Sequence, residues 1–437
     1  MNRGSVKKTV LPNGLRIISE ALPDRDSVTI GAWIEVGSRH EDPAVAGVSH
    51  FLEHMVFKGT ESRSAKEIAL ALERLGGVLN AFTTREHTCY HARVLGDDLP
   101  IAVEILADLS TRAKLPAAEV VKERKVIAEE IKDVHDTPHE YIHDLFAEQI
   151  WPGHPIGRPV AGTLKTVAGT TREELRTHRR AFYRPDRIVI AASGGLKHDH
   201  LVRLVRRQFR FSPSVDRPGA FAAPNGLVPR RTVAMRPINQ THVCVGMPTW
   251  AFADRRRYAT LVANSVLGGG MSSRLFQTVR EKRGLVYTIS AFHDSFQDAG
   301  FFAVYFACDP SQVVKAIDLV LLEMGKLSRQ PVPAVELHDA KSQLRGNLLL
   351  GLESTSSRMH RLARHELYLR RYIPPRETMK AIEAVRAHDI VAMARDAFAT
   401  DRVALSILGP VNDKVLDHID WDRLRPAQSR RGARKCA

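Results

Sequence analysis

The sequence contains few cysteines, and they are far apart. Only Cys89, Cys244, Cys308 and Cys436 occur among 437 residues, and none forms a C-x-x-C pair. This spacing excludes a disulfide framework and a thiolate zinc site, because both need cysteines in close groups. A reducing compartment is therefore expected.

Long apolar runs are also absent. No uninterrupted apolar stretch approaches the ~20 residues needed to span a bilayer. The first eight residues carry no apolar core of signal-peptide length. We therefore expect a soluble, cytoplasmic protein without a membrane partner. A mostly disordered chain is excluded too, because 44% of the residues are hydrophobic and only 26% are charged.

The charge balance is strongly basic. The 64 Lys and Arg residues exceed the 49 Asp and Glu residues and give a formal charge of +15. Such an excess can indicate nucleic-acid binding. The basic clusters at 203–210, 255–257 and 425–435 do not form a recognisable binding module. We expect no specific nucleic-acid partner, and residues 424–437 are expected to form a solvated tail.

Strand and helix signals follow one another along the first half of the chain. Asn13-Gly14 lies between apolar segments, which predicts a β-hairpin. Alternating apolar residues predict a strand over 27–36, and apolar residues at helical spacing predict a helix over 48–56. Further signals predict a helix at 65–75, strands at 78–84 and 88–95, and helices at 98–112, 116–135 and 138–150.

The same order of strands followed by helices repeats after a segment rich in turn-forming residues. Residues 211–230 are dominated by Pro, Gly, Ala and Ser, which predicts a linker. It separates an N-terminal domain at 1–210 from a similar C-terminal domain at 231–423. Neighbouring strands followed by helices favour an α+β fold over a doubly wound parallel sheet.

The most specific motif is H-F-L-E-H at residues 50–54. On a helix, His50 and His54 lie one turn apart on one face, with room for a single ion between them. Glu53 is displaced around the helix and flanks that ion. This is the inverse of H-E-x-x-H with the same chemistry, in which two imidazoles hold zinc and a carboxylate takes a proton from zinc-bound water.

A competing H-E-x-x-H motif occurs at His139 and His143. Its context is poor, because Pro138 places His139 in the first turn of a helix with charged neighbours. A third histidine of the extended motif would stand at position 149, which is Gln149. The motif at 50–54 is therefore the stronger candidate.

The acidic helix at 117–132 offers a third zinc ligand. Glu129 and Glu130 differ by ~100° around a helix, so only one of them can face the histidines. Glu123 and Glu130 are seven residues apart and share a face. That suits a ligand and a second carboxylate that orients an imidazole. The pattern does not decide which of the two is the ligand.

The motifs together resemble the pitrilysin (inverzincin) zinc metallopeptidases. The match begins at G-S-R-H-E (37–41) and G-V-S-H-F-L-E-H-M-V-F-K-G-T (47–60). It continues through residues 76–83, 154–159, 267–276, 280–287 and 351–354. The sequence looks most like the short bacterial zinc proteases and the mitochondrial processing peptidase β subunit, and the resemblance covers essentially the whole chain.

The resemblance implies roles for individual residues. The family's third zinc ligand follows the second histidine by 76 residues, which implies Glu130 as the ligand and Glu123 as the orienting carboxylate. Asn80 and Ala81 are implied to lie on an edge strand that receives the substrate main chain.

Arg280 and Tyr287 are implied to contact the substrate carbonyl and the developing oxyanion. The second half has N-S-V-L-G-G-G at 264–270 in place of a zinc helix. One zinc ion per chain is therefore expected.

The implied architecture is two similar αβ-roll domains, each a mainly antiparallel sheet flanked by helices. In this family such domains enclose a chamber, and in short chains two protomers form it. A homodimer is therefore expected, or a heterodimer with a degenerate homologue. The implied function is a zinc endopeptidase that hydrolyses peptides or unfolded segments, with Glu53 activating the water. The alternative is a catalytically silent scaffold subunit of the same fold.

Overall fold

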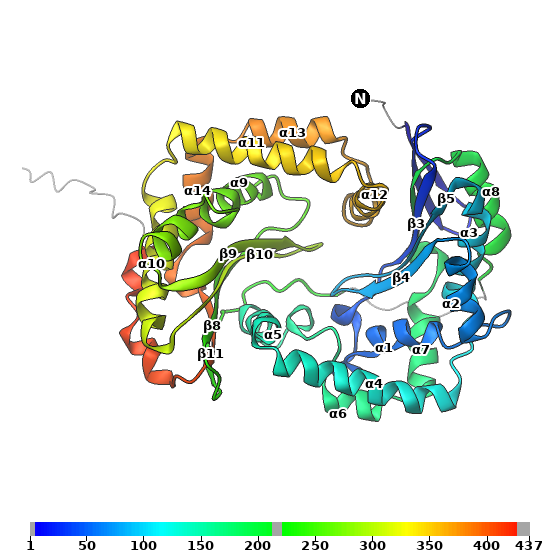
Figure 1. Cartoon of the computed structure of the whole chain (residues 1–437), viewed down its shortest axis with the longest axis horizontal. Helices are drawn as coiled ribbons and strands as arrows, with labels where there is room; N and C mark the ends of the chain where they lie inside the picture. The colour runs from blue at the N-terminus through cyan, green and yellow to red at the C-terminus, as the bar shows by residue number, and fades with distance from the viewer. Residues whose placement is uncertain (1–4, 212–220, 426–437) are drawn as a thin grey trace, which may run out of the picture. The chain divides into compact units, whose positions relative to one another are not determined.

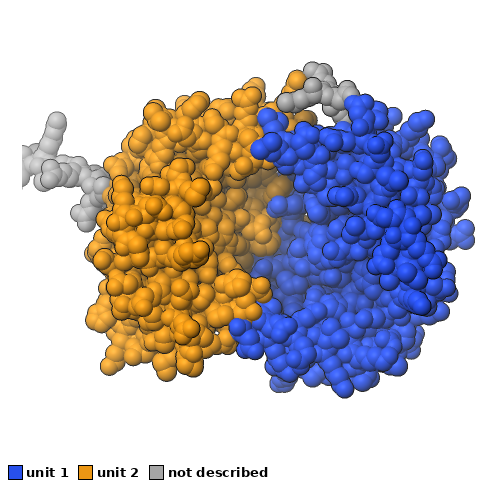
Figure 2. Space-filling model, viewed as in Figure 1, with its two compact units in different colours: residues 1–136, 154–222, 348–373 blue, residues 137–153, 223–347, 374–437 orange. Residues whose placement is uncertain are grey.

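The chain folds into two compact units. A computed structural model describes residues 5–211 and 221–425. Part of the predicted linker and nearly all of the basic tail therefore lie outside the described residues. Unit 1 comprises residues 1–136, 154–222 and 348–373, and unit 2 comprises residues 137–153, 223–347 and 374–437 (Figure 2).

Unit 1 is built on a six-stranded sheet. Its strands are β1 (Ser5–Val10), β2 (Arg16–Ala21), β3 (Ser27–Ile34), β4 (Val78–Thr83), β5 (Thr88–Leu95) and β6 (Ile188–Gly194). They lie in the order β1-β2-β6-β3-β5-β4, so β4 is an edge strand. The pair of β2 and β6 is parallel and the other four pairs are antiparallel. The Asn13-Gly14 hairpin is present, with Gly14 at φ = 91°.

Helices cover both faces of this sheet (Figure 1). The larger core contains apolar residues of α1 (Val48–Val56), α2 (Ala65–Glu73), α3 (Leu99–Arg112), α4 (Ala117–Asp136), α6 (Leu164–Gly169), α7 (Arg172–Phe182) and α8 (His198–Gln208). The opposite face carries α12 (Thr355–Leu369), whose Met359 and Leu362 pack with Trp33 and Val189 of the sheet.

Unit 2 repeats this arrangement around a five-stranded sheet. Its strands are β7 (Arg231–Met235), β8 (Thr241–Thr249), β9 (Val286–Ser295), β10 (Gly300–Cys308) and β11 (Ala404–Gly409). Their order is β7-β11-β8-β10-β9, and only the β7–β11 pair is parallel. Its helices are α5 (Pro138–Ile150), α9 (Arg257–Gly268), α10 (Val313–Arg329), α13 (Pro375–Glu383) and α14 (Ala387–Ala397).

The strand orders of the two sheets are equivalent once β1 is set aside. Each begins with a parallel pair formed by the first and last strands of the repeat, followed by three antiparallel neighbours. This topology confirms the predicted α+β class with two similar rolls. None of the helices in the described ranges combines the length and apolar character needed to cross a membrane.

Two helices do not pack within the half of the sequence to which they belong. Helix α5 precedes the predicted linker but packs against β8 and β11 of unit 2. Helix α12 follows the linker but packs against β2, β3 and β6 of unit 1. The units therefore do not coincide with the contiguous domains expected at 1–210 and 231–423. Helix α11 (Ala334–Gly351) carries the chain from unit 2 into unit 1.

Ion pairs reinforce the docking of α12. Lys8 of β1 lies 2.8 Å from Glu366, whose side chain is fully buried. Arg358 donates a hydrogen bond of 2.7 Å to Glu20 of β2. Because buried charges need partners, these contacts select one position for the helix as well as stabilising it.

Truncating the packed face of α12 should destabilise unit 1. Leu362 is 0% exposed, whereas Leu350 of α11 is 74% exposed. Leu362→Ala should cost about 2–5 kcal/mol and Leu350→Ala less than about 0.5 kcal/mol. Hydrogen exchange of the β6 amides measures the difference. Equal protection of β6 in the two variants would contradict the packing of α12 on this sheet.

Candidate metal centre

Helix α1 presents one buried and one accessible face. Phe51, Leu52 and Met55 are completely buried in the core of unit 1. The helix start is fixed by the buried Glu41 carboxylate, which accepts hydrogen bonds from the main-chain N–H groups of Gly47 at 2.6 Å and of Ser49 at 2.8 Å. A carboxylate at the N-terminus of a helix accepts hydrogen bonds from N–H groups that have no partner within the helix. Its negative charge also interacts favourably with the positive end of the helix dipole.

Two histidines and one glutamate converge beside the accessible face of α1. The Nε2 atoms of His50 and His54 are 3.2 Å apart. The Glu130 Oε2 atom of α4 lies 3.6 Å from His54 Nε2 and 3.9 Å from His50 Nε2. Within the described part of the chain, this is the group of three metal-binding side chains whose ligand atoms all lie within 4.8 Å of one another.

The donor set fits a zinc ion. Zinc–nitrogen bonds of 2.0–2.1 Å at a tetrahedral angle place two nitrogens about 3.3 Å apart. The separation of 3.2 Å between the two Nε2 atoms matches this value. Burial, with a smaller contribution from His54, lowers the pKa of His50 to about 4. The imidazole is therefore neutral near pH 7, as a metal ligand must be.

Glu123 contacts the Nδ1 side of the His54 ring, whereas Nε2 on the other side faces His50 and Glu130. The Glu123 carboxylate is 4% exposed. Its Oε1 atom is 3.0 Å from His54 Nδ1, and its Oε2 atom is 2.7 Å from Lys58 Nζ. Burial alone would raise the pKa of Glu123, but the hydrogen bonds from Lys58 and His54 hold that pKa below its usual value.

The three glutamates of α4 therefore occupy different positions. Glu130 faces both histidines, and Glu123 contacts the far nitrogen of His54. Glu129 points elsewhere and forms an exposed ion pair of 2.7 Å with Lys132. This arrangement separates the two carboxylates that the sequence pattern left as alternatives.

Glu53 flanks the group and is held by strand β4. Its Oε2 atom accepts a hydrogen bond of 2.5 Å from Thr83 Oγ1. Burial raises the pKa of Glu53, although this hydrogen bond opposes the shift. Sequence reasoning did not identify Thr83. It lies two residues beyond Ala81, and residues two apart on a strand share a face.

Asn80 and Ala81 lie on β4, at the edge of the sheet in unit 1. The main-chain N–H of Ala81 donates to Asn80 Oδ1 at 2.8 Å. A side chain of the same strand therefore satisfies this N–H.

Arg280 and Tyr287 belong to unit 2. Arg280 lies in a π-helical turn at Phe276–Glu281, and Tyr287 is the second residue of β9. The Arg280 guanidinium carbon is 5.4 Å from the centre of the Tyr287 ring, and Tyr287 is 78% exposed. The two side chains are thus neighbours.

The competing motif lies on α5. The side chain of His139 is 62% exposed. The ring of His143 packs against Phe292 and Tyr305, with centroids 5.1 and 5.4 Å away. These two histidines do not appear in a converging metal-binding group among the described residues.

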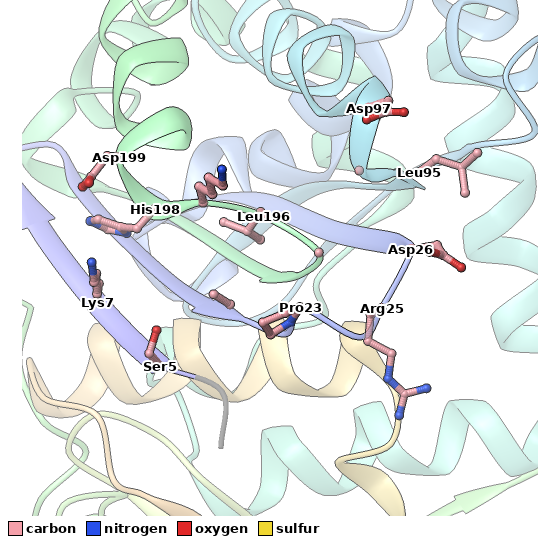
Figure 3. Close-up of a pocket in the computed structure, with 14 residues that line it drawn as sticks. Ser5, Lys7, Pro23, Arg25, Asp26, Leu95, Asp97, Leu196, His198 and Asp199 are labelled. Atoms are coloured by element: carbon pink, nitrogen blue, oxygen red, sulfur yellow. The ribbon is translucent and has the colours of Figure 1, made fainter. Parts of the chain in front are cut away.

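A hollow elsewhere in unit 1 shares no residue with the metal centre. It has a volume of about 980 Å³. Figure 3 shows the residues that line it, most of which come from β1, the loop between β2 and β3, the end of β5 and the start of α8. Its charged lining comprises Lys7, Arg25, Lys197, Asp26, Asp97 and Asp199. These acidic and basic residues are equal in number, and both ring nitrogens of the lining His198 already contact hydroxyl groups, those of Thr9 and Ser19. We therefore assign the hollow no ligand.

The chain matches known proteins over nearly its whole length. Residues 16–164 match the family described as insulinase (peptidase family M16), and residues 170–344 match the peptidase M16 inactive domain. An uncharacterized zinc protease of Streptomyces coelicolor is 42% identical over 422 residues, covering 94% of this chain and 91% of that protein. The uncharacterized zinc protease YmxG of Bacillus subtilis is 36% identical over 405 residues, covering 93% and 98%.

Solved structures share the fold. A protease from Helicobacter pylori has a TM-score of 0.86 at 22% identity, covering 93% of this chain and 99% of that chain. A peptidase M16 inactive domain from Pseudomonas fluorescens has a TM-score of 0.85 at 19% identity, with coverage of 93% and 99%. At these identities the structures support the architecture alone.

The geometry predicts unequal effects for adjacent glutamates. Glu130→Gln removes a charged donor that faces both histidines, and zinc affinity should fall by more than the ~10–100-fold typical of groups outside the ligand shell. Glu129→Gln makes the same chemical change at an exposed position and should leave affinity unchanged. Competition with a chromogenic chelator measures both variants. A larger loss in Glu129→Gln would refute the arrangement.

Proposed function

Because this chain belongs to the insulinase (M16) family of peptidases, we propose that it is a zinc-dependent endopeptidase that hydrolyses peptides or unfolded segments. The observation that carries the proposal is the convergence of His50, His54 and Glu130 beside Glu53. Three protein ligands leave a fourth position open, which is the arrangement of catalytic rather than structural zinc sites.

The chain's own groups divide the work of hydrolysis. When bound, zinc would act as a Lewis acid that polarises the scissile carbonyl and makes water a better acid. Thr83 anchors one oxygen of Glu53, which leaves the other oxygen to take a proton from the attacking water. The same carboxyl then returns that proton to the leaving amine. Burial raises the pKa of Glu53, and a higher pKa makes the carboxylate a stronger base towards the attacking water.

Substrate would bind as an extra strand on the free edge of β4. Main-chain hydrogen bonds then supply affinity, and side-chain contacts supply selectivity. The N–H of Ala81, which donates to Asn80 Oδ1 in this structure, would donate instead to a carbonyl oxygen of the substrate. This mode requires an extended backbone, so it favours unfolded segments over folded proteins.

Arg280 and Tyr287 complete the proposal as the groups that steady the oxyanion. A guanidinium and a phenol are both donors, and such donors act where negative charge develops. Their proximity to each other supports a joint role. We further propose that substrates are enclosed in a chamber completed by a second protomer. A homodimer suffices because each chain carries the full set of residues.

A catalytically silent scaffold of the same fold is the alternative. Residues 170–344 match a family model that is described as an inactive domain. In the first half, however, the ligands and the flanking Glu53 are all retained. A scaffold has no need of this set.

Replacing Glu53 by Gln should separate metal binding from hydrolysis. Zinc content should stay at the wild-type level, whereas turnover should fall ~10²–10⁴-fold because proton transfer is lost. A peptide-library digest read by mass spectrometry, with and without chelator, measures turnover, and elemental analysis measures zinc. Glu129→Gln serves as the control. Undiminished cleavage by Glu53→Gln would refute the mechanism.

Mixing two inactive variants tests whether the site is shared between protomers. If Tyr287 acts on the zinc centre of the partner, a hybrid of Glu53→Gln and Tyr287→Phe chains contains one intact site. Activity should then return after subunits are mixed and allowed to exchange. If mixtures stay as inactive as the separate variants while an affinity tag on one variant co-purifies the untagged other variant, Tyr287 acts within its own chain.

A further inference from the structure

We propose that Lys58 is a positioning residue of the metal centre, acting through Glu123 on His54. The inference rests on the proposed function, because it concerns the residues that would hold zinc. Lys58 is not among the expected ligands. Its ammonium contacts the carboxylate that in turn contacts a ligand.

The Glu123 carboxylate has a separate partner on each oxygen. His54 Nδ1 lies 3.0 Å from Oε1, and Lys58 Nζ lies 2.7 Å from Oε2. A carboxylate held on both oxygens cannot rotate about its terminal bond without losing a contact. Since Glu123 is 4% exposed, a lost contact is not replaced readily by bulk water, and an unpaired buried charge is costly.

Both partners of Glu123 come from one helical stretch. Helix α1 ends at Val56, and the main chain continues the turn, with the Lys58 N–H donating to Met55 O at 3.2 Å. Lys58 follows His54 by four residues, and side chains at this spacing lie on the same side of a helix. The His54 imidazole and the Lys58 ammonium, one turn apart, therefore both contact the Glu123 carboxylate of α4.

The segment that follows Lys58 is itself anchored. Gly59 adopts φ = 124°, a backbone conformation that favours glycine. The buried Asp108 of α3 then accepts hydrogen bonds from Thr60 Oγ1 at 2.7 Å, Ser62 Oγ at 2.5 Å and Arg63 Nη1 at 3.0 Å. This anchored loop restricts the directions that the Lys58 side chain can take.

The consequence for His54 is a fixed orientation of its ring. A carboxylate paired with an ammonium acts as an acceptor, so Nδ1 of His54 is the donating nitrogen. The lone pair on Nε2 is then directed towards His50 Nε2 and Glu130 Oε2, at 3.2 and 3.6 Å. Without Lys58, Glu123 is free to turn away from the ring, and His54 loses the contact that aims it.

The test is the zinc affinity of Lys58→Met, which keeps much of the side-chain volume and removes the charge. Zinc affinity should fall ~10–100-fold, the range found for groups that orient ligands. Lys58→Arg should retain most of the affinity, because a cation remains beside Glu123. Lys132→Met is the matched control. It removes the same charge from α4 at an ion pair that is 52% exposed on the lysine side, and it should not change affinity.

Two further measurements distinguish positioning from simple stabilisation. In a double-mutant cycle, Lys58→Met should add little to the loss caused by Glu123→Gln, because both act through one contact. The visible absorption of the cobalt-substituted protein should shift in Lys58→Met and recover in Lys58→Arg. Additive losses, or an unchanged cobalt spectrum with a lowered melting temperature of the metal-free protein, would overturn the inference.

The outcomes also separate this inference from the proposed function. Wild-type protein that binds zinc but cleaves no peptide would refute the peptidase and leave the role of Lys58 standing. Wild-type protein that cleaves peptides while Lys58→Met binds zinc equally tightly would refute the role of Lys58 alone. Absence of zinc binding by the wild type would refute both.

Discussion

The packing of helix α1 against the core of unit 1 is the constraint on which the metal centre depends. Phe51, Leu52 and Met55 are fully buried, and burying that face leaves His50 and His54 on the other. Helix α4 packs on α1 and brings its own carboxylates to the same place. The energy that fixes the ligands is therefore mostly hydrophobic, and it is present before any ion binds.

Hydrophobic packing places the side chains of the metal centre approximately, and polar contacts then fix their orientations. Glu41 secures the start of α1, and Glu123 secures one imidazole. Thr83 secures Glu53 from β4, the strand proposed to receive substrate. A disturbance at this edge of the sheet would thus reach the proposed base directly. In the proposed enzyme, substrate binding and proton transfer are coupled through the same short strand.

Local patterns in the sequence predicted the hairpin at Asn13-Gly14 and the helix carrying the histidines, because both depend on neighbouring residues. Pattern could not choose between Glu123 and Glu130, which share a helix face. The two carboxylates are ~10 Å apart along the helix axis, so they contact different atoms once α4 packs against α1. That packing is a tertiary contact, which a local pattern does not describe. The roles of Lys58 and Thr83 could not be predicted from local patterns, because their partners Glu123 and Glu53 are distant in sequence. Likewise, the apolar faces of α5 and α12 indicate burial but do not identify the sheet that each covers.

The exchanged helices also affect the order in which the chain can complete its units during synthesis. Strand β6 leaves the ribosome long before α12, so the face of the first sheet that contains Trp33 and Val189 remains uncovered while most of unit 2 is being made. Conversely, α5 emerges before any strand of its own sheet exists. Final packing of both units therefore waits for the last third of the chain. Halves cut at the predicted linker would each lack a helix and expose an apolar face.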